Sequence, residues 1–215
     1  MSCTVAELKE DVLPWIPGHL RREVVRYCAV HHPLPSAKLF LMYEEDGHAD
    51  GEMLIVGPHA SIRDDYFIQP SRSNQKSDEM DGEVAQQGVE EVELDWEADE
   101  SSPKLLQTFA AVFVKLSMST VLSLPPTITH LSLIHLTHPI PIHRLPPACP
   151  LLQFLDLSFN GWLEHPSNEM MQSLGRVDWT RWSHLQTLGW RNCFMSESML
   201  LRLNAGRWDT VNIIQ

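Results

Sequence analysis

The stretch LLQFLDLSFN, Leu151–Asn160, decides the predicted fold of this chain. It places Leu152, Leu155, Leu157 and Asn160 at the spacing L-x-x-L-x-L-x-x-N. Because side chains alternate between the two sides of a β-strand, the leucine-type positions point inward and their neighbours point outward. The stretch therefore predicts a short strand with one buried side and one open side.

The same spacing can be laid over three further segments, one before this stretch and two after it. The equivalent leucine-type position falls at Leu131, Leu155, Leu188 and Val211, at intervals of 24, 33 and 23 residues. Trp190 and Trp208 also stand at leucine-type positions, so we expect both in the core. Units of this length predict strands that stack side by side as a parallel sheet, about 4.8 Å apart. One unit cannot bury its own face, so about three are needed for stability, and the chain supplies three to four.

The segments between these strands are expected to cross the opposite side of the sheet. Residues 137–150 carry five prolines and predict an extended crossing. Residues 168–174 predict a helical turn with Met170, Met171 and Leu174 inward, and Ser196 is positioned to cap a helix over 196–204.

Both ends of such a stack need cover. A wide apolar stripe over residues 103–117 predicts a helix that caps the first strand. The C-terminal strand has no comparable cover, and an open strand edge invites pairing with another chain.

The N-terminal region, residues 1–68, does not follow the repeat spacing. Thr4 and Glu7 fit a capping box for a helix over 4–13, and a second helix is expected from residue 17 or 18 to about 30. The runs KLFLMY (38–43) and MLIV (53–56) predict a small β-hairpin, with 61–68 as a possible third strand.

Residues 69–102 form an acidic insert between this region and the capping helix plus repeats of 103–215. Between Ser77 and Pro103 lie 11 acidic residues and no basic one, and without them the formal net charge of -12 becomes -1. Such a polar segment buries too little apolar surface to order itself, so we expect disorder. Its VEEVELDW patch (89–96) is either a partner-docking motif or a solvated tether.

Composition excludes several classes of protein. There is no basic stripe for nucleic acid and no apolar run of the ~20 residues that span a bilayer, so we expect neither nucleic acid nor membrane as a partner. None of the four cysteines forms a C-x-x-C pair, and the N-terminus lacks an apolar signal region. These features predict an intracellular protein, cytoplasmic or nuclear, with reduced thiols.

No motif for catalysis stands out. The sequence lacks G-x-S-x-G and a phosphate-binding glycine loop, and the histidines between 130 and 143 do not converge as zinc ligands. We therefore expect no enzyme activity, no cofactor and no metal. The alternative that stays open is a small metal-dependent hydrolase built on the histidines and aspartates of 48–65, namely His48, Asp50, His59, Asp64 and Asp65.

The C-terminal half, 125–215, resembles the leucine-rich-repeat superfamily. Residues 148–158, ACPLLQFLDLS, are similar to the phrase CP-x-L-x-x-L-x-L-S of the cysteine-containing subtype found in F-box proteins. The resemblance implies a short leucine-rich-repeat solenoid of the α/β class. It also implies an N-terminal F-box that docks on the Skp-type adaptor of a cullin ubiquitin ligase, and residues 13–30 are faintly similar to its opening helix, with Pro17 and Gly18 as departures.

The function that these features favour is a non-catalytic protein–protein interaction module, or adaptor, that binds another protein through the concave side of the sheet. A curved stack of repeats exposes one continuous surface, and aromatic and arginine residues dominate binding energy, so Phe154, Ile134 and Arg191 are the predicted anchors. The alternative is an F-box-like substrate receptor. The predicted partner-binding residues are His130, Ser132, Ile134, Phe154, Asp156, Ser158, Thr187, Arg191, Thr210 and Asn212.

Overall fold

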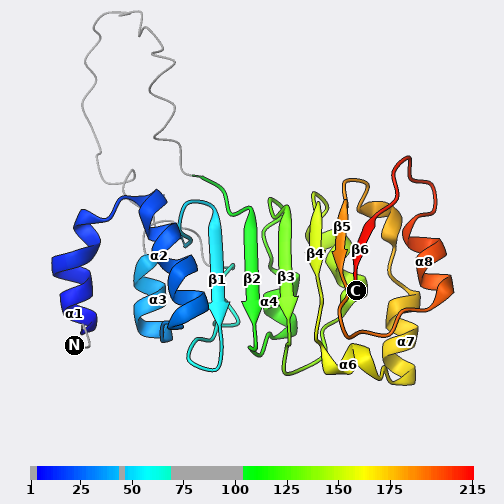
Figure 1. The fold of residues 1–215 in the computed structure, drawn as a ribbon, viewed down its shortest axis with the longest axis horizontal. Helices are drawn as coiled ribbons and strands as arrows, with labels where there is room; N and C mark the ends of the chain where they lie inside the picture. Colours follow the sequence, from blue (N-terminus) through cyan, green and yellow to red (C-terminus); the bar gives the residue numbers. More distant parts are fainter. Residues whose placement is uncertain (1–3, 44–46, 69–103) are drawn as a thin grey trace, which may run out of the picture.

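The computed structural model of the chain describes residues 4–43, 47–68 and 104–215. These residues form an α/β fold around one six-stranded sheet in which every strand is parallel to its neighbour (Figure 1). The strands follow each other in chain order across the sheet, as the repeat spacing predicts for its C-terminal part. They are β1 (Glu52–Val56), β2 (Thr108–Val112), β3 (His130–Ile134), β4 (Phe154–Asp156), β5 (Thr187–Gly189) and β6 (Asn212–Ile214).

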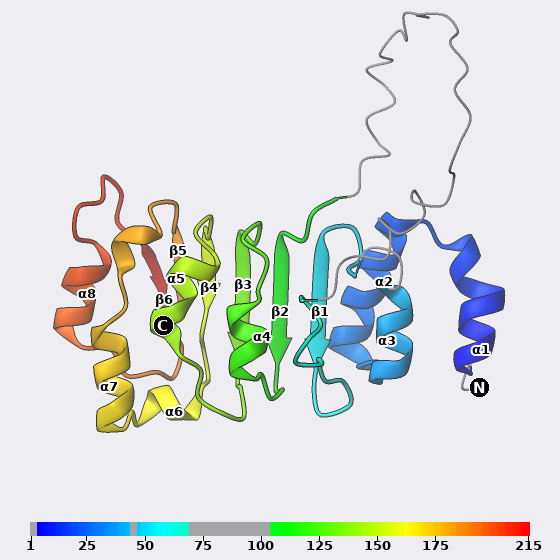
Figure 2. The same ribbon diagram turned by 180° about the vertical axis from the view of Figure 1, so that it is seen from behind.

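The helices are segregated. Those that connect β2 to β6 cross one side of the sheet, and Figure 2 shows α4 and α5 in front of the strands. The N-terminal helices α2 and α3 lie at the β1 end. The α-helices are α1 (Val5–Glu7), α2 (Gly18–His31), α3 (Ser36–Met42), α4 (Met118–Leu122), α5 (Leu145–Ala148), α6 (Gly161–Glu164), α7 (Asn168–Gly175) and α8 (Glu197–Leu203).

Shorter helical turns complete the crossings. A π-helical turn at Leu8–Val12 and a 3-10 turn at Leu13–Trp15 follow α1, and further 3-10 turns occupy Ile142–Arg144 and Trp179–Arg181. Among the helices in the described part of the chain, none combines the length and the apolar character needed to cross a bilayer. The cytoplasmic or nuclear location stays a prediction.

The core is a set of inward rows that run across the sheet. Phe109, Leu131, Leu155 and Leu188 are register partners on successive strands, and each is fully buried. The predicted equivalence of residues 131, 155 and 188 is therefore confirmed. At roughly 25 cal/mol per Å² of apolar surface, such rows supply most of the free energy that holds three-residue strands together.

The last strand is shifted from its predicted register. Leu188 pairs with Ile213 and not with Val211, although Val211 is also buried. Trp208, predicted in the core, is fully exposed in the loop before β6, whereas Trp190 is buried as expected. The observed register puts Thr210, Ile213 and Gln215 at the leucine-type positions, so it is set by the backbone pairing with β5 and not by the apolar spacing.

The helix predicted over 103–117 is wrong: residues 104–107 have no regular structure, and β2 follows. Phe109 and Ala111 point inward while Thr108, Ala110 and Val112 are only partly buried, which is the alternation of a strand. β2 pairs with β1 on one side and with β3 on the other, and this pairing outweighs the helical spacing of the apolar residues.

The predicted β-hairpin is also wrong. The run KLFLMY belongs to α3 and the following turn, with Leu39, Met42 and Tyr43 buried at helical spacing. MLIV lies in a strand as expected, but that strand, β1, pairs in parallel with β2. Residues 61–68 contain turns and no strand. The acidic insert of 69–102 lies outside the described residues.

Other local predictions hold. The capping box of Thr4 and Glu7 is present, α2 spans the predicted second helix, and the side chain of Ser196 caps α8. The crossing over 137–150 is extended at most in its first part, because a 3-10 turn at Ile142–Arg144 and α5, with prolines in its first turn, occupy 142–148. Met171, predicted inward, is 38% exposed.

The outer edge of β1 is closed by one side chain. The Tyr43 hydroxyl accepts a hydrogen bond from the Leu54 N–H and donates one to the Leu54 carbonyl, both at 2.9 Å. These are backbone groups that an edge strand would otherwise offer to another strand. Burial raises the pKa of Tyr43 well above its ordinary value, and the hydrogen bond with Leu54 offsets only part of that rise.

An ion-pair cluster fastens α2 to the start of β1. Asp50 pairs with Arg22 and with Lys104, and Arg26 donates to both oxygens of Glu52. The hydrogen bond and charge of Lys104, together with Arg22, lower the pKa of Asp50. The cluster ties three segments that are distant in the sequence.

A single buried amide joins β3 to β4. Asn160 Oδ1 accepts a hydrogen bond from the Leu136 N–H at 2.7 Å, and Nδ2 donates to the carbonyls of Leu133 and Leu157. The residue is fully buried. It therefore satisfies three backbone groups that water cannot reach.

We predict that Asn160→Ala lowers the free energy of unfolding by about 4 kcal/mol, because each buried group left without a partner costs about 1–3 kcal/mol. Urea denaturation measures this. Asn168→Ala, at the exposed start of α7, is the matched control and should change stability by less than about 0.5 kcal/mol. Equal effects of the two variants would contradict this role.

We predict that Asp50→Asn destabilises the chain at neutral pH by about 1 kcal/mol. Asparagine tolerates the left-handed backbone of residue 50, so the change removes the charge and one of the two acceptor oxygens without straining the backbone. Because folding lowers the pKa of Asp50, its contribution is present above the unfolded pKa of about 3.9 and is lost as the pH falls through the folded value. Unfolding free energies at pH 7 and near pH 3 should show the difference between the proteins shrinking in acid; a constant difference would refute the assignment.

Candidate functional site

One side of β2–β6 carries no helix, and we call it the open face. Its residues are the outward positions of the strands, and Figure 1 looks onto this side. At β1 the same side is covered, because Val25 and Cys28 of α2 lie against Leu54 and Val56. The open face therefore begins at β2 and extends to β6.

The strand register arranges the open face in two complete rows. Neighbouring residues within a row are backbone partners on adjacent strands. The first row is Thr108, His130, Phe154, Thr187 and Asn212, and the second is Ala110, Ser132, Asp156, Gly189 and Ile214.

Most of the predicted partner-binding residues lie on this face. The pairing of β3, β4, β5 and β6 brings them together, and each is exposed or partly buried. They are His130, Ser132, Ile134, Phe154, Asp156, Thr187 and Asn212. Arg191, just after β5, is exposed at the end of the same side.

Two predicted residues have other roles. Ser158 is almost fully buried, and its hydroxyl accepts a hydrogen bond from the Arg191 N–H at 3.0 Å, so it fixes the backbone. Thr210 is exposed but precedes β6, because the true register of that strand starts two residues later than predicted.

The open face mixes apolar and polar side chains. On β2 and β3 it presents Ala110, Val112 and Ile134 beside Thr108 and His130. On β4 and β6 it presents Asp156 and Asn212 beside Phe154 and Ile214. A partner that covers the face would meet both kinds of side chain in each half.

The carboxylate of Asp156 has a fixed place on β4, the middle strand of the open face. Its Oδ1 accepts a hydrogen bond from the Ser158 N–H at 2.9 Å. A Cβ added to Gly189, the register partner on β5, would lie 2.3 Å from the same oxygen. The missing side chain at Gly189 therefore leaves the space that the carboxylate occupies.

A recurring left-handed residue ends four of the strand units. Phe113, His135, Phe159 and Asn192 have φ between 50° and 61°, and each follows its inward strand residue by the same number of positions. Bulky side chains rarely adopt this conformation, which costs on the order of 1–2 kcal/mol. The Phe113 and Phe159 rings are 43% and 46% exposed, and the Phe113 ring lies 5.0 Å from that of His135.

Sequence reasoning missed this row and the β2 positions. A signal for β2 existed, since Leu106, Phe109, Ala111 and Val114 follow the repeat spacing and precede the next unit by 22 residues. No hydrophobic pattern signals the left-handed backbone at a phenylalanine, because that conformation depends on the ladder of hydrogen bonds around it. In that ladder the Phe113 N–H donates to Ile134 and the Phe159 N–H to Arg191.

Two residues of the alternative metal site are engaged elsewhere. His48 Nδ1 accepts a hydrogen bond from the Gly51 N–H, and Asp50 belongs to the ion-pair cluster. Within residues 4–43, 47–68 and 104–215, no three metal-ligating side chains gather into a possible site. Burial raises the pKa of Cys149 to about 12, which keeps that thiol protonated.

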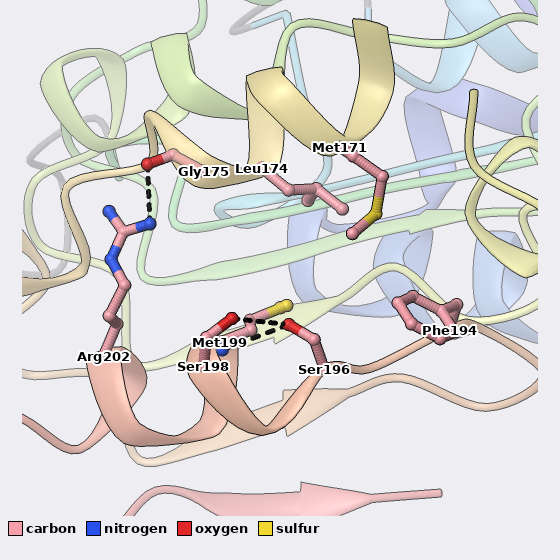
Figure 3. A pocket seen from close by; sticks show the side chains of 8 residues that line it. All are labelled: Met171, Leu174, Gly175, Phe194, Ser196, Ser198, Met199 and Arg202. Atoms are coloured by element: carbon pink, nitrogen blue, oxygen red, sulfur yellow. Dashed lines mark hydrogen bonds between the residues drawn. The ribbon is translucent and has the colours of Figure 1, made fainter. Parts of the chain in front are cut away.

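A small pocket lies between α7 and α8, away from the open face (Figure 3). Its volume is about 70 Å³, well below the several hundred Å³ of typical ligand sites. Arg202 at its margin donates to the carbonyls of Gly175 and Val177, so the guanidinium joins α8 to the end of α7. We interpret the pocket as a packing gap between α7 and α8.

Comparison with known proteins gives no relative: no family model matches the sequence, and no curated protein or solved structure is significantly similar to it. The geometry of this chain is therefore the basis on which its function is inferred.

Proposed function

We propose that the chain is a non-catalytic protein-binding module, a short leucine-rich-repeat solenoid whose open face is the concave contact surface. The observation that carries the proposal is the unequal cover of the sheet. The connections between β2 and β6 all cross one side, and the other side of these strands presents two continuous rows of side chains.

The repeat geometry supports the assignment. Four successive units, beginning at Leu106, Ile128, Leu152 and Leu185, place buried residues at the same four positions of L-x-x-L-x-L-x-x-N, with Cys193 partly buried at the last of them. Asn160 occupies the asparagine position and bonds the backbone of the preceding unit. Repeat proteins use the surface of such a stack for binding because each unit adds a strip to it.

We expect the double change Phe154→Ala and Arg191→Ala to weaken partner binding about tenfold or more while the chain stays folded, because Phe154 lies on the open face, Arg191 is exposed just after β5, and neither is in the core. A photo-crosslinking residue at Ser132 supplies the readout and should yield a covalent adduct with the partner. The same residue at Gln172 on α7 should not.

The matched control is Phe194→Ala with Arg144→Ala, an aromatic and an arginine from the helical side. Circular dichroism verifies folding of all variants. Adducts from Gln172 but not from Ser132, or equal binding by the two double variants, would refute the open face as the contact surface.

A second candidate, the F-box-like substrate receptor, is favoured by one observation on α2. Leu20, Tyr27 and Val30 are 47%, 62% and 77% exposed, and their spacing places them on one side of the helix. Trp15, in the preceding turn, is 82% exposed. An apolar strip of this kind is typical of a helix that docks on another protein, and α3 supplies a helix where the sequence predicts a strand.

If α2 docks on a Skp-type adaptor, the triple change to serine at Leu20, Tyr27 and Val30 should abolish co-purification with the recombinant adaptor. Leu201→Ser, which removes a leucine that is 75% exposed from α8, should leave it intact. Failure of the unaltered chain to bind the adaptor would remove this candidate and leave the open-face proposal untouched.

A further inference from the structure

We infer that Asp156 anchors a basic side chain of the partner, with arginine preferred over lysine, at the centre of the open face. The inference rests on the proposed function and gives the partner its chemistry: a segment that carries an exposed arginine. Three features of the face lead to it.

First, the carboxylate is held in place before any partner binds. The Ser158 N–H fixes Oδ1, and the side-chain-free surface of Gly189 receives it. A charged group that is already oriented loses little entropy on binding, so more of its interaction energy appears as affinity.

Second, this carboxylate lacks the partner that the other shielded acids have. Asp50 pairs with Arg22 and Lys104, and Glu52 pairs with Arg26. No basic side chain among the described residues forms an ion pair with Asp156. By register, the nearest basic residue is Arg191. It lies two residues after Gly189, the backbone partner of Asp156 on β5, and it is exposed.

Third, an aromatic pair stands beside the carboxylate. Phe154 is two residues before Asp156 on the same side of β4, about 6.6 Å along the strand. Its ring stacks with that of His130, with centroids 6.1 Å apart and planes inclined by 23°. A guanidinium can stack on an aromatic ring and bind a carboxylate through two N–H groups, which an ammonium cannot do.

The charge of the whole chain acts in the same direction. Eleven of the acidic residues behind the formal net charge of -12 lie between Ser77 and Pro103, so the long-range attraction of basic segments comes from the chain as a whole and not from the open face. An acidic segment would be repelled at long range and would meet Asp156 at the centre of the face.

The test selects peptides from a phage-displayed library of random sequences on the full chain. The library is first depleted on the Phe154→Ala/Arg191→Ala variant, so that only binders dependent on the open face survive. We expect the survivors to share a basic position, with arginine more frequent than lysine. Fluorescence anisotropy then gives the affinity of the most enriched peptide for each variant.

Asp156→Asn keeps an acceptor for the Ser158 N–H and removes the charge and the second acceptor oxygen, so it should weaken that peptide about tenfold or more. Gly189→Ala keeps the charge but displaces the carboxylate, and should weaken the peptide similarly. Asp178→Asn, which removes an exposed carboxylate from the helical side, should have no effect. Replacing the basic residue of the peptide by glutamine should weaken binding to the unaltered chain and not to Asp156→Asn.

The possible failures are distinguishable. Survivors without a basic position, or survivors indifferent to Asp156→Asn, would overturn the arginine anchor and keep the open face as a binding surface. A depleted library that yields no binder would count against both the anchor and the proposed function.

Discussion

The alignment of inward side chains in rows across the sheet is the constraint on which the rest of the structure depends. A strand of three residues such as β4 or β5 is not stable alone, and each buries its inward leucine only because the neighbouring strand presents another at the same height. The stack is therefore held by contacts between adjacent units. Asn160 fixes the height of β4 relative to β3, since its amide reaches backbone groups of both units.

This constraint separates the two sides of the sheet. Every connection from β2 to β6 returns over the inward rows, because only there can its apolar residues be buried. The outward positions are left to water or to a partner and are free of the demands of packing. The left-handed aromatic residues at the strand ends fit this division: Phe113 and Phe159 keep bulky, half-exposed rings in a conformation that glycine or asparagine would adopt with less strain.

The parts of the fold that sequence could predict are those in which leucine occupies the repeat positions. β3, β4 and β5 have leucine at the shared inward position, so their alignment can be predicted from the sequence. β2 has phenylalanine and alanine at the inward positions, and its apolar residues also fit the spacing of a helix. Only the pairing with β1 and β3 shows that this segment is a strand. KLFLMY is too short for periodicity to separate a helix from a strand. The error of two residues at β6 preserved which side chains point outward, because strands alternate with a period of two, and most of the predicted open face survived it.

The Tyr43 hydroxyl has a consequence for how this architecture can be extended. It occupies the backbone groups of Leu54 that a seventh strand would need, and α2 and α3 stand beside it. In the described part of the chain, no strand pairs with the outer edge of β6. Lengthening of the sheet is therefore one-directional: a duplicated unit, or a strand donated by another molecule, can be accommodated beyond β6, whereas insertion before β1 would require the tyrosine to leave.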